Sequence, residues 1–307
     1  MTVAARAPGE NELVDFHSLE PLEGGWSGQT FVSEAAGDRT VVRIYPPASR
    51  SGTGPQVDAA VLRLVRGLVP VPTVLEVRPG DVGRDRPGVL VTAWVEGVRG
   101  DELLPSLAGE ELAHVARALG GLAADLGAMP MLRPGGFADA DLTIDPWDLD
   151  LPAYLESLEP ELAHLSAEEL DGLREVALAA QVLLDTVERT CLVHGDLNPK
   201  NLLLDPGSLE VVALLDWEFA HAGHPFTDLG NLLRFDREPV YVAAVLAEYG
   251  RRHGVAPADA LMLARAADLF ALVELATRRG QNPVADRADR LLRAIAATRD
   301  PQADPPA

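Results

Sequence analysis

The sequence predicts an α+β fold with two lobes, a small β-rich lobe followed by a larger α-helical lobe. Short runs of β-branched residues separated by turn formers fill residues 28–94, which is typical of strands. After Gly97 the apolar residues recur at helical spacing instead. With 307 residues, 47% of them apolar, the chain is long enough to bury a full core in one large domain or two smaller ones.

The first lobe is predicted to contain a sheet that carries one helix. Between the second and third predicted strands, Val57, Ala60, Val61 and Leu64 recur at helical spacing, so we expect a helix over residues 56–66. The β-branched runs predict antiparallel strands at residues 29–34, 40–45, 73–77 and 89–94.

The second lobe is predicted to be mostly helical. Leu112, Val115, Leu119 and Leu126 lie on one face of a helix, and a second helix is expected over 168–188. Two short strands (201–204 and 211–215) and further helices (240–298) complete the lobe. We therefore expect an N-terminal lobe (1–95), a C-terminal lobe (96–297) and a disordered, proline-rich tail (298–307).

Composition excludes several classes of protein. The single cysteine, Cys191, rules out a disulfide scaffold. A formal net charge of −21 disfavours nucleic acid and anionic membranes as partners and favours a cationic small molecule. The first residues lack the apolar segment of a signal peptide, so a cytoplasmic location is predicted. The sequence leaves open whether the protein is a monomer or a homodimer.

The strongest functional signal is the segment LVHGDLNPKNLLL at residues 192–204, followed by the segment LLDWE. It places His194, Asp196 and Asn201 in an HxDxxxxN pattern before a strand, and Asp216 fifteen residues beyond Asn201. Phosphoryl transfer needs one carboxylate that accepts the proton of the attacking hydroxyl. It also needs an Asn and a second carboxylate that hold Mg²⁺ against the nucleotide phosphates. The pattern therefore predicts a phosphotransferase.

These motifs resemble those of the aminoglycoside phosphotransferase and choline kinase superfamily, which shares the bilobal fold of protein kinases. The resemblance implies that Asp196 is the catalytic base and that Asn201 and Asp216 are the metal ligands. It also implies that Asp228, in the segment HAGHPFTDLGNLLRF, braces the catalytic loop. Mg²⁺ and ATP or GTP as phosphate donor follow from the same resemblance. It further implies that the N-terminal lobe (1–95) binds the nucleotide and that the C-terminal lobe (96–297) is the catalytic and substrate-binding lobe.

Four residues in or after this motif have less certain roles. His194 is predicted to orient the loop, with direct catalysis as the alternative. Lys200, the only lysine of the chain, either contacts the transferred phosphate or faces solvent. His221 and His224 are three residues apart, but no third ligand at a known spacing accompanies them, so a structural role is favoured over a metal site.

The first lobe contains four further candidates for nucleotide binding. Ser27 and Gly28, in a glycine-rich segment before a strand, suit backbone contacts to phosphates, although an ordinary hairpin has the same pattern. Arg43 stands where protein kinases have a lysine, so the resemblance implies contacts to the α and β phosphates. Asp58 matches the kinase helix glutamate and is expected to pair with Arg43; a solvated Asp58 is the alternative.

The apolar strand at 89–94 and the turn after it resemble the hinge of the family. Adenine is then expected to bond to backbone groups of Ala93 and Val95, with Thr92 at the entrance to a back pocket. Without the motif at 192–204 this segment would be read only as a strand and a turn.

Twelve acidic residues lie between Asp139 and Glu175, opposed within that segment only by Arg174. In the family that the sequence resembles, helices in this region help form the acceptor pocket and their acids bind ammonium groups, so the resemblance implies such a pocket here. Most are expected to be solvated, but a few, with Glu218, are candidate substrate contacts. The leading expectation is a kinase that inactivates a cationic antibiotic, an aminoglycoside or a basic peptide, and so confers resistance. The alternatives are a metabolic kinase for an amino alcohol, sugar or nucleoside-like acceptor, and a pseudokinase that only binds.

Overall fold

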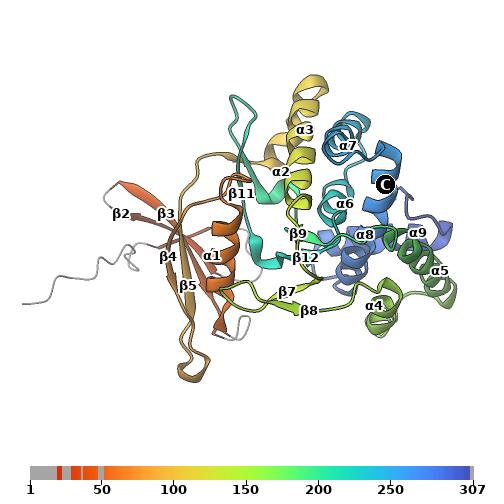
Figure 1. Ribbon diagram of the computed structural model, residues 1–307, viewed down its shortest axis with the longest axis horizontal. Helices are drawn as coiled ribbons and strands as arrows, with labels where there is room; N and C mark the ends of the chain where they lie inside the picture. Colours follow the sequence, from red (N-terminus) through yellow and green to blue (C-terminus); the bar gives the residue numbers. More distant parts are fainter. Residues whose placement is uncertain (1–18, 23–28, 36, 48–51, 305–307) are drawn as a thin grey trace, which may run out of the picture. The chain divides into compact units, whose positions relative to one another are not determined.

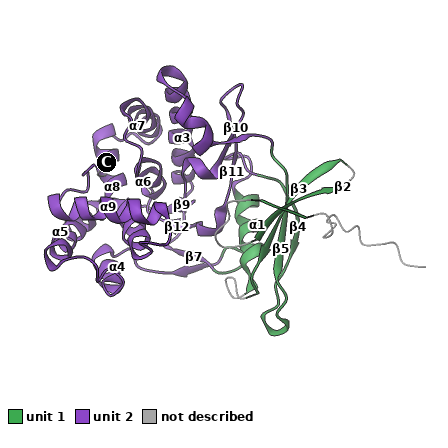
Figure 2. Cartoon of the chain, turned by 180° about the vertical axis from the view of Figure 1, so that it is seen from behind, with its two compact units in different colours: residues 1–64, 72–95, 138–142 green, residues 65–71, 96–137, 143–307 purple. Residues whose placement is uncertain are grey.

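The computed structural model describes residues 19–22, 29–35, 37–47 and 52–304, and the chain divides into two compact units (Figure 2). Unit 1 comprises residues 1–64, 72–95 and 138–142, and unit 2 comprises residues 65–71, 96–137 and 143–307. The chain passes from the strands of unit 1 to unit 2 between Val95 and Glu96. Relative to the predicted ranges, residues 65–71 lie with the second unit and residues 138–142 with the first.

Unit 1 is built on an antiparallel sheet of five strands in the order β1-β2-β3-β5-β4 (Figure 1). Val42, Val89 and Val91 form its buried apolar cluster, as expected for β-branched residues on a pleated surface. The helix α1 (Gly54–Val65) follows β3 along the chain. The strands are β1 (Glu20–Pro21), β2 (Gln29–Ala35), β3 (Asp38–Tyr45), β4 (Val74–Arg78) and β5 (Gly88–Ala93).

Unit 2 contains two small sheets. The first has the order β11-β10-β6 and contains β6 (Val98–Arg99), β10 (Leu202–Leu204) and β11 (Val211–Leu214). The second has the order β8-β7-β12-β9. It contains β7 (Gly135–Phe137), β8 (Ile144–Pro146), β9 (Cys191–Val193) and β12 (His221–Gly223). Each sheet therefore joins segments that are far apart in the sequence.

Helices make up the rest of unit 2, and small residues let them approach closely. α3 packs against α7 (Figure 1), where a Cβ on Gly120 would lie 2.4 Å from the Val245 carbonyl oxygen. The other packed pairs include α5 with α9 and α6 with α8. The helices are α2 (Gly100–Leu103), α3 (Gly109–Gly127), α4 (Leu151–Leu158), α5 (Ala167–Leu184), α6 (Thr227–Leu233), α7 (Pro239–His253), α8 (Pro257–Thr277) and α9 (Pro283–Thr298).

The predicted α+β class, with strands first and helices after, is confirmed. The expected tail was placed to begin too early, because Thr298 is the last residue of α9 and the Ala303 carbonyl accepts a hydrogen bond from Arg237 Nη2 at 3.2 Å. Residues 305–307 of the expected tail lie outside the described residues. Across the part of the chain that the structure describes, no helix is long and apolar enough to cross a membrane.

Candidate active site

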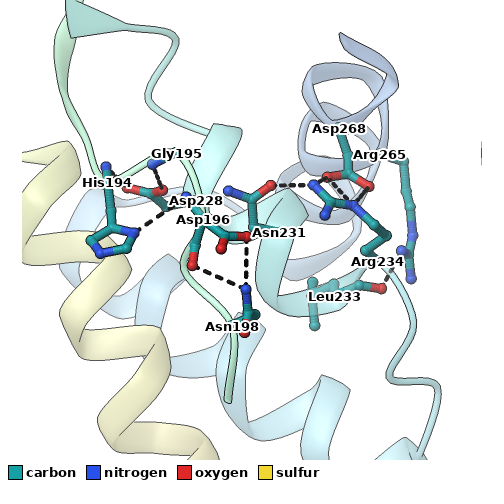
Figure 3. A network of polar contacts seen from close by, with 10 residues as sticks. All are labelled: His194, Gly195, Asp196, Asn198, Asp228, Asn231, Leu233, Arg234, Arg265 and Asp268. Carbon is teal, nitrogen blue, oxygen red and sulfur yellow. Dashed lines mark hydrogen bonds and ion pairs between the residues drawn. The ribbon is translucent and has the colours of Figure 1, made fainter. Parts of the chain in front are cut away.

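The loop between β9 and β10, residues 194–201, is anchored by a buried carboxylate on α6. Asp228 Oδ2 accepts a hydrogen bond from the His194 backbone N–H at 2.8 Å, and Oδ1 accepts one from the Gly195 N–H at 3.0 Å (Figure 3). Burial raises the pKa of the Asp228 carboxyl, while the electrostatic effect of the nearby His194 ring and the two N–H groups oppose that rise. The geometry therefore gives Asp228 the contacts of a brace for this loop.

The backbone of the loop turns sharply at Gly195. Its φ is +84°, a left-handed conformation that is costly for residues with a Cβ. A Cβ at this position would also lie 2.5 Å from the backbone oxygen of Phe219. The glycine is therefore required both by the turn and by the close approach of the 217–219 segment.

His194 connects this loop to the residues after β11. Its Nε2 lies 2.9 Å from the Leu215 carbonyl oxygen, and its Nδ1 accepts a hydrogen bond from the Asp196 backbone N–H at 3.2 Å. An N–H directed at Nδ1 requires a lone pair there, so the proton sits on Nε2. The buried ring also packs edge-on against Trp217, at 4.6 Å between centroids. All these contacts are within the protein, as an orienting role requires.

The Asp196 carboxylate is held by two amide side chains. Asn198 Nδ2 donates to Oδ1 at 2.7 Å and Asn201 Nδ2 donates to Oδ2 at 2.8 Å. Both amides also bond the Asp196 carbonyl oxygen, at 3.1 and 2.9 Å. Side chain and backbone are thus fixed together, and an ionised carboxylate fixed in this way is a ready proton acceptor.

Asn198 is a residue of the site that the sequence analysis did not single out. Besides holding Asp196, its Oδ1 accepts the Lys200 backbone N–H at 3.0 Å and caps the short 3₁₀ helix Pro199–Asn201. The available signal was an Asn before a Pro, which commonly starts a turn. The cap also accounts for the position of the half-buried Lys200 on this turn.

The β10–β11 hairpin brings the two predicted metal ligands to the same end of a strand pair. Leu202 pairs with Leu214, and the Leu215 N–H donates to the Asn201 carbonyl at 2.8 Å. Asp216 follows at once, with a left-handed backbone (φ +61°, ψ +68°) that turns the chain into the 217–219 segment. Glu218 is half-buried in the 3₁₀ turn that follows.

The donor set at this hairpin end fits Mg²⁺ bound together with a nucleotide. Mg²⁺ prefers oxygen ligands and commonly takes one or two protein carboxylates plus substrate phosphates and water. Asp216 supplies a carboxylate and Asn201 an amide oxygen. Among the residues that the structure describes, no three His, Cys, Asp or Glu side chains gather to make an all-protein metal cage.

His221 and His224 both have contacts within the protein. His221 Nδ1 lies 2.8 Å from the Phe219 carbonyl oxygen, and its ring lies 5.5 Å from the Trp147 ring. His224 is buried, and burial lowers its pKa to about 4. These surroundings suit structural histidines.

Beside Asp196 lies a buried polar network on α6 and α8 (Figure 3). Arg234 Nη2 donates to Asp268 Oδ1 at 2.7 Å and also to Asn231 Oδ1, and Arg234 Nε lies 3.0 Å from Asp268 Oδ2. Burial opposes the Arg234 charge, but the carboxylates of Asp268 and Asp196 outweigh it and hold the pKa of Arg234 above its usual value. Arg265, also on α8, donates to the Leu233 carbonyl.

In unit 1 a tyrosine connects two predicted site residues. The Tyr45 hydroxyl donates to Asp58 Oδ2 at 2.6 Å, and the Arg43 guanidinium lies 5.2 Å from the Tyr45 ring centroid. Asp58 is buried on α1, so the alternative of a solvated carboxylate is wrong. The sequence analysis missed Tyr45, whose position two residues beyond Arg43 on the same strand was the available signal.

The remaining nucleotide-binding candidates lie at two places in unit 1. Ala93 ends β5, and its N–H donates to the Thr73 carbonyl at 2.8 Å. Val95 follows the sheet and is half-buried. Ser27 and Gly28 lie outside the described residues.

Several of the twelve acids between Asp139 and Glu175 have structural partners. Glu159 and Asp171 pair with Arg174, at 2.7 and 2.8 Å. Others pair with arginines of α9 or of the turn that ends it: Glu169 with Arg293 and Glu175 with Arg299, both at 2.8 Å. Asp150 caps α4, and Glu169 completes a capping box on α5. The acids with these partners stabilise the fold. Counting the charges within the segment alone did not reveal this role.

A family model described as the phosphotransferase enzyme family matches residues 18–264. The chain belongs to this family. The match spans both units and includes the whole 194–228 segment, and it confirms the resemblance predicted from the motifs.

The curated relatives of this phosphotransferase-family chain are longer proteins. It is 24% identical over 231 residues to acyl-CoA dehydrogenase family member 10 of Mus musculus, which covers 71% of this chain and 21% of that protein. It is 40% identical over 73 residues to acyl-CoA dehydrogenase family member 11 of the same organism, covering 24% of this chain and 9% of the relative. The chain thus spans a minor part of each.

Solved structures confirm that this chain has the predicted protein-kinase-like fold. The GDP complex of wild-type aminoglycoside 2'-phosphotransferase-IIIa matches with a TM-score of 0.70 and 18% identity, covering 94% of this chain and 95% of that one. Aminoglycoside-3'-phosphotransferase of type VIII matches with a TM-score of 0.54 and 27% identity, covering 82% and 94%. A ternary complex of aminoglycoside phosphotransferase APH(4)-Ia with ADP and hygromycin B matches with a TM-score of 0.63 and 16% identity, covering 92% of each chain.

Proposed function

We propose that this phosphotransferase-family protein moves the γ-phosphoryl group of ATP or GTP to a hydroxyl of a small molecule. The observation that carries the proposal is the Asp196 carboxylate, whose two oxygens are fixed by Asn198 and Asn201 on a loop braced by Asp228. Fixing the carboxylate before the acceptor arrives lowers the cost of orienting base and hydroxyl together. Asp196 then accepts the proton of the attacking hydroxyl.

Mg²⁺ is proposed to be held by Asp216 and Asn201 at the end of the β10–β11 hairpin. Bound there with the nucleotide, it neutralises charge on the phosphates. The amide of Asn201 has two separate functions in this arrangement. Its nitrogen already holds Asp196 Oδ2 at 2.8 Å, which leaves its oxygen as the group for the metal.

Unit 1 is proposed to supply the remaining nucleotide contacts. Arg43 carries a planar fork of donors that suits phosphate oxygens. The Tyr45 ring lies beside it, and the hydrogen bond from Tyr45 to Asp58 fixes that ring. Ser27 and Gly28 remain predicted phosphate contacts, and Ala93 and Val95 remain predicted contacts to the base.

Two acceptor classes are considered. The sequence analysis favoured a cationic antibiotic, and structural neighbours described with hygromycin B and kanamycin support that class. However, at least five of the twelve acids on which it rested have partners within the fold. The curated relatives bear acyl-CoA dehydrogenase names, which favours the metabolic alternative, with a hydroxylated acyl thioester as a further acceptor to test.

The test is a panel assay on the purified protein with Mg²⁺ and ATP or GTP. The panel contains aminoglycosides, basic peptide antibiotics, amino alcohols, nucleosides and hydroxylated acyl thioesters, and mass spectrometry detects the gain of one phosphoryl group. Only an antibiotic product supports a resistance role, and a thioester or amino alcohol product supports the metabolic class. Nucleotide binding without any product would favour a metabolite outside the panel, and a lack of nucleotide binding as well would support the pseudokinase alternative.

Asp196→Ala is the decisive variant for the mechanism. It should lose phosphoryl transfer by about 100- to 10,000-fold, the usual contribution of a positioned base, and still bind nucleotide. The matched control is Asp171→Ala, which removes an exposed acid of α5 that pairs with Arg174. Full turnover by Asp196→Ala would refute the assignment of the base.

A further inference from the structure

Arg237 and Arg265, two arginines beside the Arg234 network, donate to backbone carbonyl groups, whereas Arg234 binds a carboxylate. Arg265, on α8, is only 4% exposed, and Arg237, in the segment after α6, is half-buried. Arg265 donates to the Leu233 carbonyl and Arg237 to the Ala303 carbonyl. Arg234, in contrast, forms an ion pair with Asp268.

Neither Arg237 nor Arg265 has a carboxylate within 4.0 Å in the described part of the chain. The Nε atoms of both side chains are buried, and across the described ranges neither has a hydrogen-bond partner. A buried donor without a partner is costly, and most such donors in proteins are paired with protein or water. The chain as a whole has a net charge of −21, so acidic residues are abundant, yet these two arginines have few acidic partners.

The charged groups around the two arginines do not make up for this shortage of acidic partners. Burial and the like charge of Arg237 lower the pKa of Arg265 to about 10, although Asp268 and Asp304 act in the opposite direction. Burial likewise lowers the pKa of Arg237. Both side chains remain charged at neutral pH, so a bound anion would stabilise both.

We propose that Arg237 and Arg265 form an anion-binding site for a carboxylate or phosphate monoester group of a small molecule. Guanidinium forks bind both groups through short, charge-assisted hydrogen bonds. Arg265 offers a buried Nε, and the half-buried Arg237 gives access from solvent. The site goes beyond the proposed phosphotransferase function and requires neither nucleotide nor Mg²⁺.

Asp304 is the internal counter-charge of this site. Its carboxylate acts on both arginines, and the neighbouring Ala303 accepts the hydrogen bond from Arg237. An incoming anion must therefore bind against the field of Asp304. Asp304→Asn should strengthen anion binding, whereas a loss of either arginine should weaken it.

The experiment measures binding of methyl phosphate and acetate to the full chain at constant ionic strength, with chloride as the reference anion. Isothermal titration calorimetry gives the affinity, and the ¹H–¹⁵N signals of the arginine Nε–H groups locate the site. The two probes distinguish a phosphate site from a carboxylate site. Arg237→Gln and Arg265→Gln should each weaken binding about 10- to 100-fold, the range for a charged hydrogen bond.

Arg189→Gln is the matched control, because Arg189 also donates to a backbone carbonyl, that of Gly127, and it should leave the affinity unchanged. If Arg265→Gln does not fold, two other variants still test the site. Arg237→Gln, at a half-buried position, should weaken anion binding, and Asp304→Asn should strengthen it. Wild-type protein that binds neither probe, or variants that bind as tightly as wild type, would overturn the site. Such failure would not affect the phosphotransferase proposal, which is tested by product formation.

Discussion

Replacing Gly195 by Ala tests whether the backbone of the 194–201 loop sets the position of Asp196. Alanine at φ +84° costs about 1–2 kcal/mol in backbone strain. Its Cβ would also lie 2.5 Å from the Phe219 oxygen, whereas ordinary contacts begin at 3.4 Å. The loop or the 217–219 segment must therefore move by about 0.9 Å, the difference between those two distances.

A displacement of this size is large for a catalytic group. Misplacing a reacting group by about 1 Å costs about 100-fold in rate, so kcat should fall by about that factor. Overpacking adds about 1–3 kcal/mol to the strain, for a total loss of about 2–5 kcal/mol in the free energy of unfolding. The contacts proposed between Arg43 and the nucleotide should change much less, because Arg43 lies on β3 in unit 1.

Gly254→Ala is the matched control for this prediction. Gly254 follows α7 with φ +68°, and a Cβ there would have nothing within 4 Å. It should therefore lose only the strain, about 1–2 kcal/mol, and keep its kcat. Urea unfolding and phosphoryl-transfer kinetics are measured on both variants. Equal losses of stability and equal kcat values in the two would refute the reasoning from the close approach.

Two further predictions concern buried charged groups. Arg234→Leu leaves Asp268 buried without its cation and should lower the free energy of unfolding in urea by about 3–5 kcal/mol. The double variant with Asp268→Leu should recover most of that loss, and a double variant no more stable than the single one would contradict this. His224 has a folded-state pKa of about 4, below its usual 6.5. As pH falls, the unfolded state therefore binds the proton before the folded state does. The free energy of unfolding should thus fall as pH drops from 6.5 to 4. The slope from this residue is about 1.4 kcal/mol per pH unit, and His224→Gln should lack it; an unchanged slope in pH-dependent unfolding would show that other groups cause it.

Sequence patterns predicted the long elements and the chemistry-bearing loop because those signals are local. The helix α3 runs from Gly109 to Gly127 and contains every residue of the predicted apolar face. The strand β3 begins two residues before the predicted start, within the uncertainty of element ends. The spacing of Asp196, Asn201 and Asp216 likewise reflects one loop and one hairpin, both short in sequence.

The parts that sequence patterns missed depend on contacts between distant segments. β9 and β12 have three residues each and form because they pair with distant strands: His221 of β12 lies opposite Val193 of β9 and also opposite Gly136 of β7. Glu169 and Glu175 of α5 appeared unopposed because their arginine partners stand more than a hundred residues further along. Tyr45 was missed for a similar reason, because its hydroxyl meets Asp58 only after α1 has folded beside β3.

The only lysine of the chain, Lys200, stands on the turn that Asn198 caps. Apart from the amino terminus, any amine-directed reagent must therefore modify this turn: an acylating dye, a reductive methylation used for crystallisation, or coupling to a sensor surface. In most proteins such labelling scatters over many sites. Here a single mass adduct would identify modified molecules, and whether nucleotide protects that amine would decide between the two predicted roles of Lys200, a phosphate contact or a residue facing solvent.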